Sequence, residues 1–215
     1  MSRDTLRLYQ AAASPNSRRV RIFLAEKGIC LTMVPVDLGA KEQFTEAFGR
    51  VNPRRVVPAL DLGDGTVIGE VPAILRYLEE TYPTNPLRGT GAKDKALVTM
   101  WERRMELEGF AAVMETVRNK ALGLQGRAIA GPHPYEQIPA LVERGTRRVA
   151  DFHADLETRL AEAPFVAGEQ FSVADITAVV TVDFAAKALG APIPEGNASS
   201  RGWYDRVSAR PSMTA

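Results

Sequence analysis

The chain has 215 residues, enough for one large domain or two small ones with a buried core. Its 27 basic and 26 acidic side chains nearly cancel to a formal net charge of +1, so no strong field favours nucleic acid or anionic lipid. No apolar run is long enough to span a bilayer, and residues 1–5 lead into no signal-peptide pattern. We therefore expect a globular cytoplasmic protein with no nucleic-acid or membrane partner.

The cysteine and histidine content is low. Cys30 is the only cysteine, so no intrachain disulfide can form, and a reducing compartment is expected. Its place past the end of the first predicted helix suggests an inert, buried thiol. His133 and His153 lack partners at metal-ligand spacing, so no metal site is predicted.

The first part of the chain alternates strand and helix patterns. Strands are predicted at residues 6–9, 31–37, 59–62 and 66–68, the last two joined in a hairpin by the turn at 63–65. Helices are predicted from Asn16 or Ser17 to Lys27, over residues 41–50, and from Pro72 to about Tyr82. This order, β-α-β-α-β-β-α, predicts an α/β domain over residues 1–82.

The second part of the chain shows no strand pattern. Residues 83–91 are rich in proline and glycine and are interpreted as a linker. Helices are predicted over residues 92–122, 135–162, 172–189 and 201–209, with a long loop at 123–134. Residues 92–215 are therefore predicted to form an all-α helical-bundle domain.

Residues 52–60 (NPRRVVPAL) and residues 69–78 (GEVPAILRYL) together resemble segments of the glutathione S-transferase family. In the family segment that residues 52–60 resemble, the proline follows a cis peptide bond. The resemblance implies a thioredoxin-like domain in which the backbone of Val57, before Pro58, pairs with glutathione like an added strand. Cis bonds are only about 5–6% of X–Pro bonds, so the alternative is an ordinary trans proline at a strand start.

Residues 69–78 (GEVPAILRYL) resemble the start of the family's last thioredoxin-domain helix. The resemblance implies that the N–H of Val71 binds the γ-glutamyl carboxylate and that Glu70 binds the neighbouring ammonium group. The alternative for Glu70 is an acidic residue that only stabilises a helix N-terminus. In the second domain, residues 171–176 (FSVADI) resemble the family's capping box, a folding element with Ser172 as the cap and Asp175 reaching back.

Residues 14–20 (SPNSRRV) resemble the helix start of serine-type members of the family, whose first serine activates the thiol. The resemblance therefore implies that Ser14 is the catalytic hydroxyl and stabilises the glutathione thiolate. Ser17 is an alternative, although it is the better candidate for the helix cap. Asn16 and Tyr9 also remain open, Tyr9 with the competing interpretation of a packed strand aromatic.

Two features of the glutathione site depart from the family pattern. Val71 stands where a serine or threonine hydroxyl usually binds the γ-glutamyl carboxylate, and Val56 stands where a polar side chain is common. Arg54 and Arg55 replace the residues usual there and are candidates for new charge partners. These departures leave the affinity for glutathione open, because Val71 lacks the hydroxyl but keeps its backbone N–H.

The family resemblance implies a transferase of alkyl or aryl groups that adds glutathione, as co-substrate, to a small hydrophobic electrophile. The helical domain would supply the second-substrate pocket from Met105, Phe110, Met114 and Val117, although such side chains are more often core. A detoxifying homodimer is expected. The alternatives are a glutathione-dependent isomerase or dehalogenase, and a non-catalytic assembly or binding module with the same fold.

Overall fold

The structure is a computed structural model that describes residues 6–215. Residues 1–5, on which the prediction of no signal peptide rests, lie outside the described part. The chain forms two compact units. The first runs to Asn85 and includes Ala130–Pro134, and the second comprises Pro86–Ile129 and Tyr135–Thr214. The polypeptide thus changes unit between Asn85 and Pro86, inside the predicted linker.

A four-stranded mixed sheet forms the centre of the first unit. Its strands are β1 (Arg7–Gln10), β2 (Thr32–Pro35), β3 (Ala59–Asp61) and β4 (Val67–Ile68), in the order β2-β1-β3-β4. Strand β1 runs parallel to β2 and antiparallel to β3, and β3 runs antiparallel to β4. The C-terminal ends of β1 and β4 and the N-terminal end of β3 therefore lie at the same edge of the sheet.

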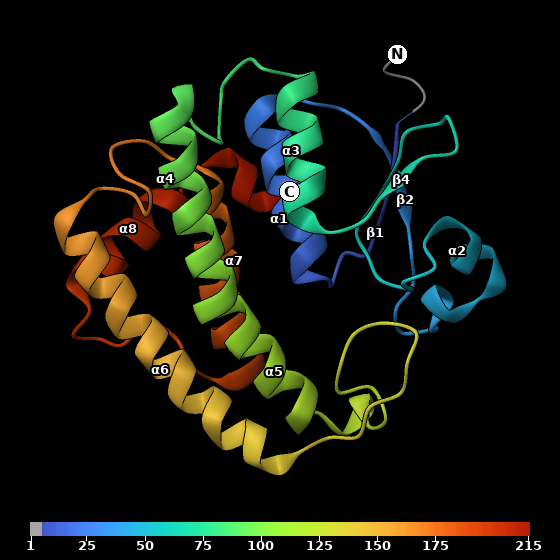
Figure 1. The fold of residues 1–215 in the computed structure, drawn as a ribbon. Coiled ribbons are helices and arrows are strands. Elements are labelled where there is room, and N and C mark those ends of the chain that lie inside the picture. Colours follow the sequence, from blue (N-terminus) through green and yellow to red (C-terminus); the bar gives the residue numbers. More distant parts are fainter. Residues whose placement is uncertain (1–5) are drawn as a thin grey trace. The chain divides into compact units, whose positions relative to one another are not determined.

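Helices cover both faces of this sheet. They are α1 (Pro15–Lys27), the short 3-10 segment η2 (Glu42–Phe44), α2 (Glu46–Val51) and α3 (Val71–Thr81). Helices α1 and α3 lie side by side on one face, and α2 lies on the other (Figure 1). Many of their apolar residues are buried together with those of the strands; fully buried examples are Leu8, Phe23, Leu60, Ile74 and Leu78. This is the predicted β-α-β-α-β-β-α order of a thioredoxin-like domain.

Two details of the first unit differ from the sequence-based expectation. The single helix predicted over residues 41–50 is two segments, because Thr45 is extended (φ −67°, ψ 156°) and its hydroxyl caps α2 at the N–H of Phe48. Cys30 is exposed, and the prediction of a buried thiol is wrong. Gly28, in the left-handed conformation (φ 62°), ends α1, and Cys30 lies in the surface connection that follows.

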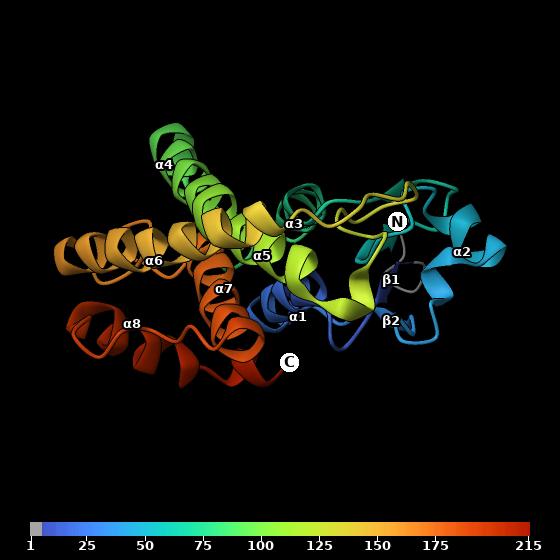
Figure 2. The same cartoon turned by 90° about the horizontal axis from the view of Figure 1, so that it is seen from below.

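The second unit is helical. Its elements are α4 (Gly91–Arg104), the π-helical segment η3 (Met105–Phe110), α5 (Ala111–Lys120), η4 (Leu122–Leu124), α6 (Pro139–Glu162), α7 (Val173–Leu189), α8 (Ala198–Ser208) and η5 (Pro211–Thr214). Helices α4 and α5 follow each other in one continuous rod, and α6 packs along α5 (Figures 1 and 2). The helices α5, α6 and α7 meet at a cluster of Ala112, Val113, Val149 and Ala185.

Two helix predictions for the second unit are corrected. The rod predicted over residues 92–122 has a π-helical turn at its middle, where Gly109 lies directly against the ring of Phe152. A Cβ at Gly109 would lie only 2.5 Å from that ring, so the close approach requires glycine. Helix α6 begins at Pro139 and not at Tyr135, since proline lacks an N–H and suits a first helical turn.

The predicted capping box at the start of α7 is confirmed. The hydroxyl of Ser172 accepts from the N–H of Ala174, and the carboxylate of Asp175 accepts from the N–H of Ser172. Asp175 is fully buried and also accepts from the N–H of Val166 (2.9 Å) and the indole N–H of Trp203 (2.9 Å). Burial raises the pKa of Asp175 to about 6, although these hydrogen bonds favour the charged form.

None of the helices in residues 6–215 combines the length and apolar character that a membrane crossing requires. Within the same residues, His, Cys, Asp and Glu side chains form no group of three or more that could hold a metal ion.

Candidate functional site

The topology of the first unit brings the predicted glutathione-site segments to one edge of the sheet. Ser14 follows the C-terminal end of β1, Val57 precedes the N-terminal end of β3, and Glu70 follows the C-terminal end of β4. Val57 also packs in a buried cluster with Ala11, three residues before Ser14. Three segments far apart in the sequence therefore meet where β1 and β4 end and β3 begins.

Ser14 is the N-cap of α1. Its hydroxyl oxygen accepts from the N–H of Ser17 (3.2 Å), and Pro15 occupies the first helical turn. The side chain is largely buried, with 8% of the residue exposed. A hydroxyl can accept and donate at once, and no group in the described chain takes the proton of Ser14. Ser14 therefore has a donor left for a ligand at the start of α1.

The three alternatives to Ser14 have other surroundings. Ser17 is not the cap, as the sequence suggested, but is fully buried, and its hydroxyl oxygen accepts from the N–H of Ala11 (3.2 Å). The amide oxygen of Asn16 accepts from Arg19 (3.3 Å). Tyr9 packs edge-to-face against Phe48, with ring centroids 6.2 Å apart, as a packed strand aromatic does.

The Val57–Pro58 peptide bond is cis, as the family resemblance implies. Just before it, the side chain of Asn52 donates to the C=O of Val56 (2.8 Å) and holds the loop. The side chain of Val57 is buried, while its backbone N–H and C=O form no hydrogen bond within the described residues. One residue thus offers a donor and an acceptor to an extended peptide ligand.

The start of α3 supplies further groups at the same edge. Glu70 is exposed and adopts a left-handed backbone conformation (φ 63°), which is uncommon for a residue other than glycine. Its C=O accepts from the N–H groups of Ala73 (3.1 Å) and Ile74 (3.0 Å). Pro72 has no N–H, so Val71 provides an amide N–H at the positive end of the helix.

Arg21 fixes the loop before Ser14, and sequence reasoning missed it. Its guanidinium donates to the side chain of Gln10 (2.7 Å) and to the C=O groups of Ala11 and Ala12 (both 3.3 Å). Burial and the nearby charge of Arg18 lower the pKa of Arg21. The sequence signal that could have revealed this role is the position of Arg21, about two turns into the helix that follows β1.

The two arginines beside Val56 differ in their surroundings. Arg55 adopts a left-handed conformation (φ 55°), and its guanidinium donates to the C=O groups of Phe44 and Thr45. It therefore holds the loop around α2, which argues against its prediction as a charge partner of glutathione. Arg54 is exposed and remains available.

The predicted second-substrate residues lie in the second unit on η3 and α5. Met105 and Phe110 are buried, and the ring of Phe110 lies 6.1 Å from that of Phe184. Val117 packs against the core cluster of α5, α6 and α7, whereas Met114 is half-buried. Packing against neighbouring helices therefore accounts for Phe110 and Val117.

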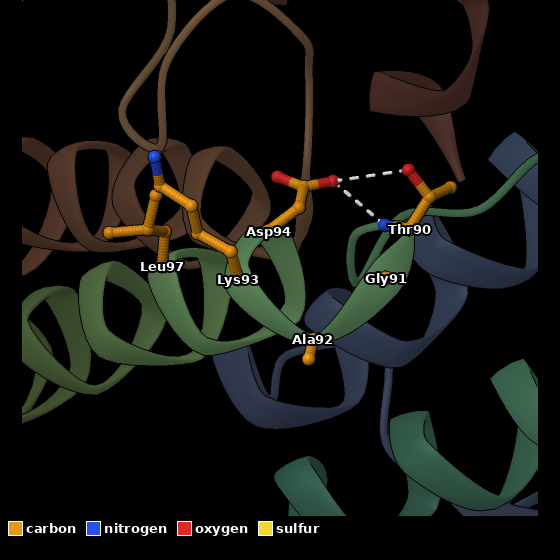
Figure 3. A pocket seen from close by; sticks show the side chains of 6 residues that line it. All are labelled: Thr90, Gly91, Ala92, Lys93, Asp94 and Leu97. Carbon is orange, nitrogen blue, oxygen red and sulfur yellow. Dashed lines mark hydrogen bonds between the residues drawn. The ribbon is translucent and has the colours of Figure 1, made fainter.

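A surface hollow of about 430 Å³ lies elsewhere on the second unit, at the start of α4. Figure 3 shows its lining, in which Asp94 accepts hydrogen bonds from the N–H and the hydroxyl of Thr90. The carboxylate of Asp94, in the first turn of α4, thus pairs with Thr90, the N-cap residue of the same helix. None of the predicted substrate residues lines this hollow.

A thioredoxin-like unit with a cis proline before β3, joined to an all-helical unit, defines a class of protein that binds a thiol peptide at the sheet edge. Residues 8–86 match the description "Glutathione S-transferase, N-terminal domain", and residues 139–206 match "Glutathione S-transferase, C-terminal domain". The chain belongs to the glutathione S-transferase family, whose members use glutathione as co-substrate.

Individual relatives agree with this assignment. The chain is 32% identical to glutathione S-transferase 2 of Saccharomyces cerevisiae over 96% of its own length and 87% of the yeast protein. The crystal structure of Gtt2 from Saccharomyces cerevisiae, 32% identical, superposes with a TM-score of 0.87 over 97% of this chain and 98% of the yeast chain. The maleylacetoacetate isomerase of Rattus norvegicus is 45% identical, but over only 43% of this chain and 44% of the rat protein.

Proposed function

We propose that this protein is a glutathione transferase in which the hydroxyl of Ser14 stabilises the thiolate of glutathione. The single observation that carries the proposal is the hydrogen bonding of Ser14. Its oxygen accepts the N–H of Ser17 and caps α1, while its proton has no acceptor in the described chain. A thiolate placed there would accept that proton at the positive end of a helix.

The same sheet edge supports the binding of the rest of glutathione. The N–H and C=O of Val57 suit the cysteinyl backbone, and the N–H of Val71 suits the γ-glutamyl carboxylate. Glu70, which is exposed, suits the γ-glutamyl ammonium group. Together with Ser14, these partners come from three different segments, so an extended tripeptide can engage all of them at once.

The chemistry follows from the acidity of the thiol. A free thiol has a pKa of roughly 8.5, so only a small fraction is ionised at neutral pH. A hydroxyl that donates to the sulfur favours the anion, and one unit of pKa corresponds to about 1.4 kcal/mol. The thiolate then attacks an electrophilic carbon, a carbon–sulfur bond forms, and the leaving group departs with the electron pair of the broken bond.

The remaining expectations accompany this proposal. We expect the enzyme to consist of two domains, residues 1–82 and 92–215, joined by a linker at 83–91. We also expect it to form a homodimer and to act in the cytoplasm. The second substrate is expected to be a small apolar electrophile bound by the helical domain, with Met114 as its half-buried candidate contact.

Glutathione binding is the first test. Titration of the protein with millimolar glutathione in a calorimeter should give saturable heat, since three segments present unpaired donors and acceptors. S-methylglutathione, which lacks the acidic proton, serves as the control and should bind without the proton release that an activated thiol gives. An absence of heat and of thermal protection by glutathione would overturn the proposal.

The role of Ser14 is tested by kinetics with chlorodinitrobenzene. Ser14→Ala should lower kcat roughly ten- to hundredfold, the effect of one hydrogen bond to a charged group, while glutathione binds with nearly unchanged affinity. The matched control is Asn16→Ala, which removes a neighbouring polar group at the same helix start. A smaller loss for Ser14→Ala than for Asn16→Ala would transfer the role to Asn16.

A glutathione-dependent isomerase is the second candidate, favoured by the similarity of part of the chain to the rat isomerase. The two activities differ in the fate of glutathione. A transferase consumes it in proportion to product, whereas an isomerase releases it unchanged after each turnover. Measurement of free thiol during the reaction with a maleyl-type cis-alkene substrate distinguishes the two activities. A pure binding module would turn over neither kind of substrate.

A further inference from the structure

One face of α1 holds the turn at residues 11–14, which leads from β1 to Ser14. Ser17 and Arg21 lie four residues apart in α1, so their side chains project from the same face of the helix. The hydroxyl oxygen of Ser17 accepts from the N–H of Ala11 (3.2 Å). The guanidinium of Arg21 donates to the C=O groups of Ala11 and Ala12 (both 3.3 Å). The turn is therefore anchored at two points on the helix that Ser14 caps.

Ser14 is joined to this anchored turn by its own backbone. The N–H of Ser14 donates to the C=O of Ala11 (3.0 Å), which is one of the two carbonyls that Arg21 binds. The hydroxyl oxygen of Ser14 accepts from the N–H of Ser17 (3.2 Å). A movement of the Ala11 carbonyl would therefore be transmitted directly to the backbone of Ser14 and to the direction of its hydroxyl.

Arg21 also fixes the direction of two peptide groups in the turn. The peptide bonds on either side of Ala12 are trans, so each N–H points away from the C=O of the same peptide group. Because the guanidinium binds the C=O groups of Ala11 and Ala12, the N–H groups of Ala12 and Ala13 point away from Arg21. Within residues 6–215 neither N–H has an acceptor. The negative ends of these two peptide dipoles are thus bound to a cation, and their positive ends are unpaired.

The charge of Arg21 is not neutralised by a carboxylate within the part of the chain that the structure describes. Its third contact is with the side-chain oxygen of Gln10 (2.7 Å), which is an uncharged amide. Burial and, second, the nearby charge of Arg18 lower the pKa of Arg21, as expected where no anion faces the guanidinium. A guanidinium still remains protonated near neutral pH. The turn before Ser14 is therefore held by a group that carries a full positive charge.

We propose that Arg21 is a positioning residue for the thiolate of glutathione, because it holds the turn in the arrangement that presents the hydroxyl of Ser14 to the sulfur. The inference rests on the proposed function, since it takes the sulfur to accept the proton of Ser14. Without the guanidinium, the carbonyls of Ala11 and Ala12 would be free to rotate toward the sulfur, and their negative ends would disfavour the anion. Loss of Arg21 should therefore make the bound thiol a weaker acid.

The test measures the ionisation of bound glutathione as a function of pH, from the ultraviolet absorbance of the thiolate and from kcat/KM with chlorodinitrobenzene. Arg21→Gln should raise the apparent pKa of the bound thiol by about one unit, which means about tenfold less thiolate at a pH below both pKa values. The KM for glutathione should stay within about twofold, because the backbone groups of Val57 and Val71 are unchanged. A loss of rate by the same factor at every pH, or an unchanged pH profile, would overturn the positioning role.

Arg21→Lys separates position from charge. Lysine keeps the positive charge, but its single ammonium group lacks the planar fork that can bind two carbonyls at once. It should raise the pKa of the bound thiol by about half a unit, and it decides the question if Arg21→Gln does not fold. A profile of Arg21→Lys identical to that of the wild type would assign any effect of Arg21→Gln to charge alone and would overturn the positioning role.

Arg76→Gln is the matched control, because it removes an arginine charge from the same unit without touching the turn. Arg76 is exposed on α3 and pairs with Glu80 (2.9 Å). The variant should leave the pKa of the bound thiol and the KM for glutathione unchanged. An equal shift in Arg76→Gln and Arg21→Gln would mean that any lost positive charge has this effect, and the role of Arg21 would be wrong.

Hydrogen exchange without glutathione separates this inference from the proposed function. Arg21→Gln should speed the exchange of the Ser14 N–H, which the Ala11 carbonyl accepts, about tenfold. If the wild type ionises glutathione and Arg21→Gln changes neither exchange nor pH profile, the inference fails and the proposed function stands. If the wild type forms no thiolate, the proposed function fails. Faster exchange in Arg21→Gln would then show that Arg21 holds the turn for folding alone, and its role toward the thiolate would be wrong.

Discussion

Helices α1 and α7 both begin at a serine, but the two helix starts differ in how completely their polar groups are paired. At α7, Asp175 joins Ser172, Val166 and Trp203 in a buried network in which each donor has an acceptor. At α1, Ser14 caps the helix alone and keeps an unused proton. A helix cap in which every donor has an acceptor (a saturated cap) serves folding. We propose that the cap at α1, which keeps an unused donor (an unsaturated cap), serves ligand binding.

The largest expected effect concerns the saturated cap. Asp175→Ala leaves buried donors of Val166, Ser172 and Trp203 without an acceptor, each costing about 1–3 kcal/mol. Urea unfolding should show a loss of about 3 kcal/mol or more. The control is Asp94→Ala, which removes a carboxylate from the exposed start of α4 (Figure 3) and should cost about 1 kcal/mol or less. Similar losses for both variants would mean that burial contributes little at α7.

The second effect is a pH dependence of stability. Folding raises the pKa of Asp175 from 3.8 to about 6, so the folded state holds this proton more tightly than the unfolded state. The resulting stabilisation is complete below the unfolded pKa and is lost as the pH rises through the folded pKa. The advantage of the wild type over Asp175→Asn should therefore shrink by about 1 kcal/mol from about pH 5 to about pH 7.

Wild type and Asp175→Asn must be compared at each pH, because His153 changes the stability with pH in the opposite direction to Asp175. Burial lowers its pKa, so its contribution to stability is lost as the pH falls below the unfolded value of 6.5. Both proteins contain His153, and its effect cancels in the difference between their unfolding free energies. A difference that grows from about pH 5 to about pH 7 would show that the pKa of Asp175 is not raised.

The smallest effect distinguishes the two serines. Ser14→Ala and Ser172→Ala each remove a helix cap and should each lower the unfolding free energy by about 1 kcal/mol. Only Ser14→Ala should also reduce turnover of glutathione, measured at a temperature at which both variants are folded. Equal losses of turnover would show that the two caps do not differ in function.

Much of the fold could be predicted from local sequence patterns. The hairpin around residues 63–65 and the helix after Pro72 are determined by nearby glycine and proline residues. The capping box of Ser172 and Asp175 was also recognisable, because its partners lie three residues apart. The network around it was not, since Trp203 lies far along the chain and only the tertiary structure brings it to Asp175.

Other features depended on packing that the sequence does not display. The π-helical turn of η3 accompanies the close approach of Gly109 to Phe152, which comes from another helix. The cap of α1 was wrongly predicted as Asn16 or Ser17, because both residue types are good caps and only the structure shows that the chain is extended at Ser14 and helical after it. The candidate site followed from residues that resemble the family, but the role of Arg21 did not, because its contacts with Gln10, Ala11 and Ala12 depend on how α1 packs beside β1.

The exposed Cys30 gives the protein a single attachment point for a reporter group. It is the only cysteine of the chain and follows the C-terminal end of α1, a helix of 13 residues. At about 1.5 Å per residue, roughly 20 Å of helix separate it from Ser14. A maleimide fluorophore placed there would report on the thioredoxin-like unit while leaving the sheet edge unobstructed, with no engineered cysteine needed.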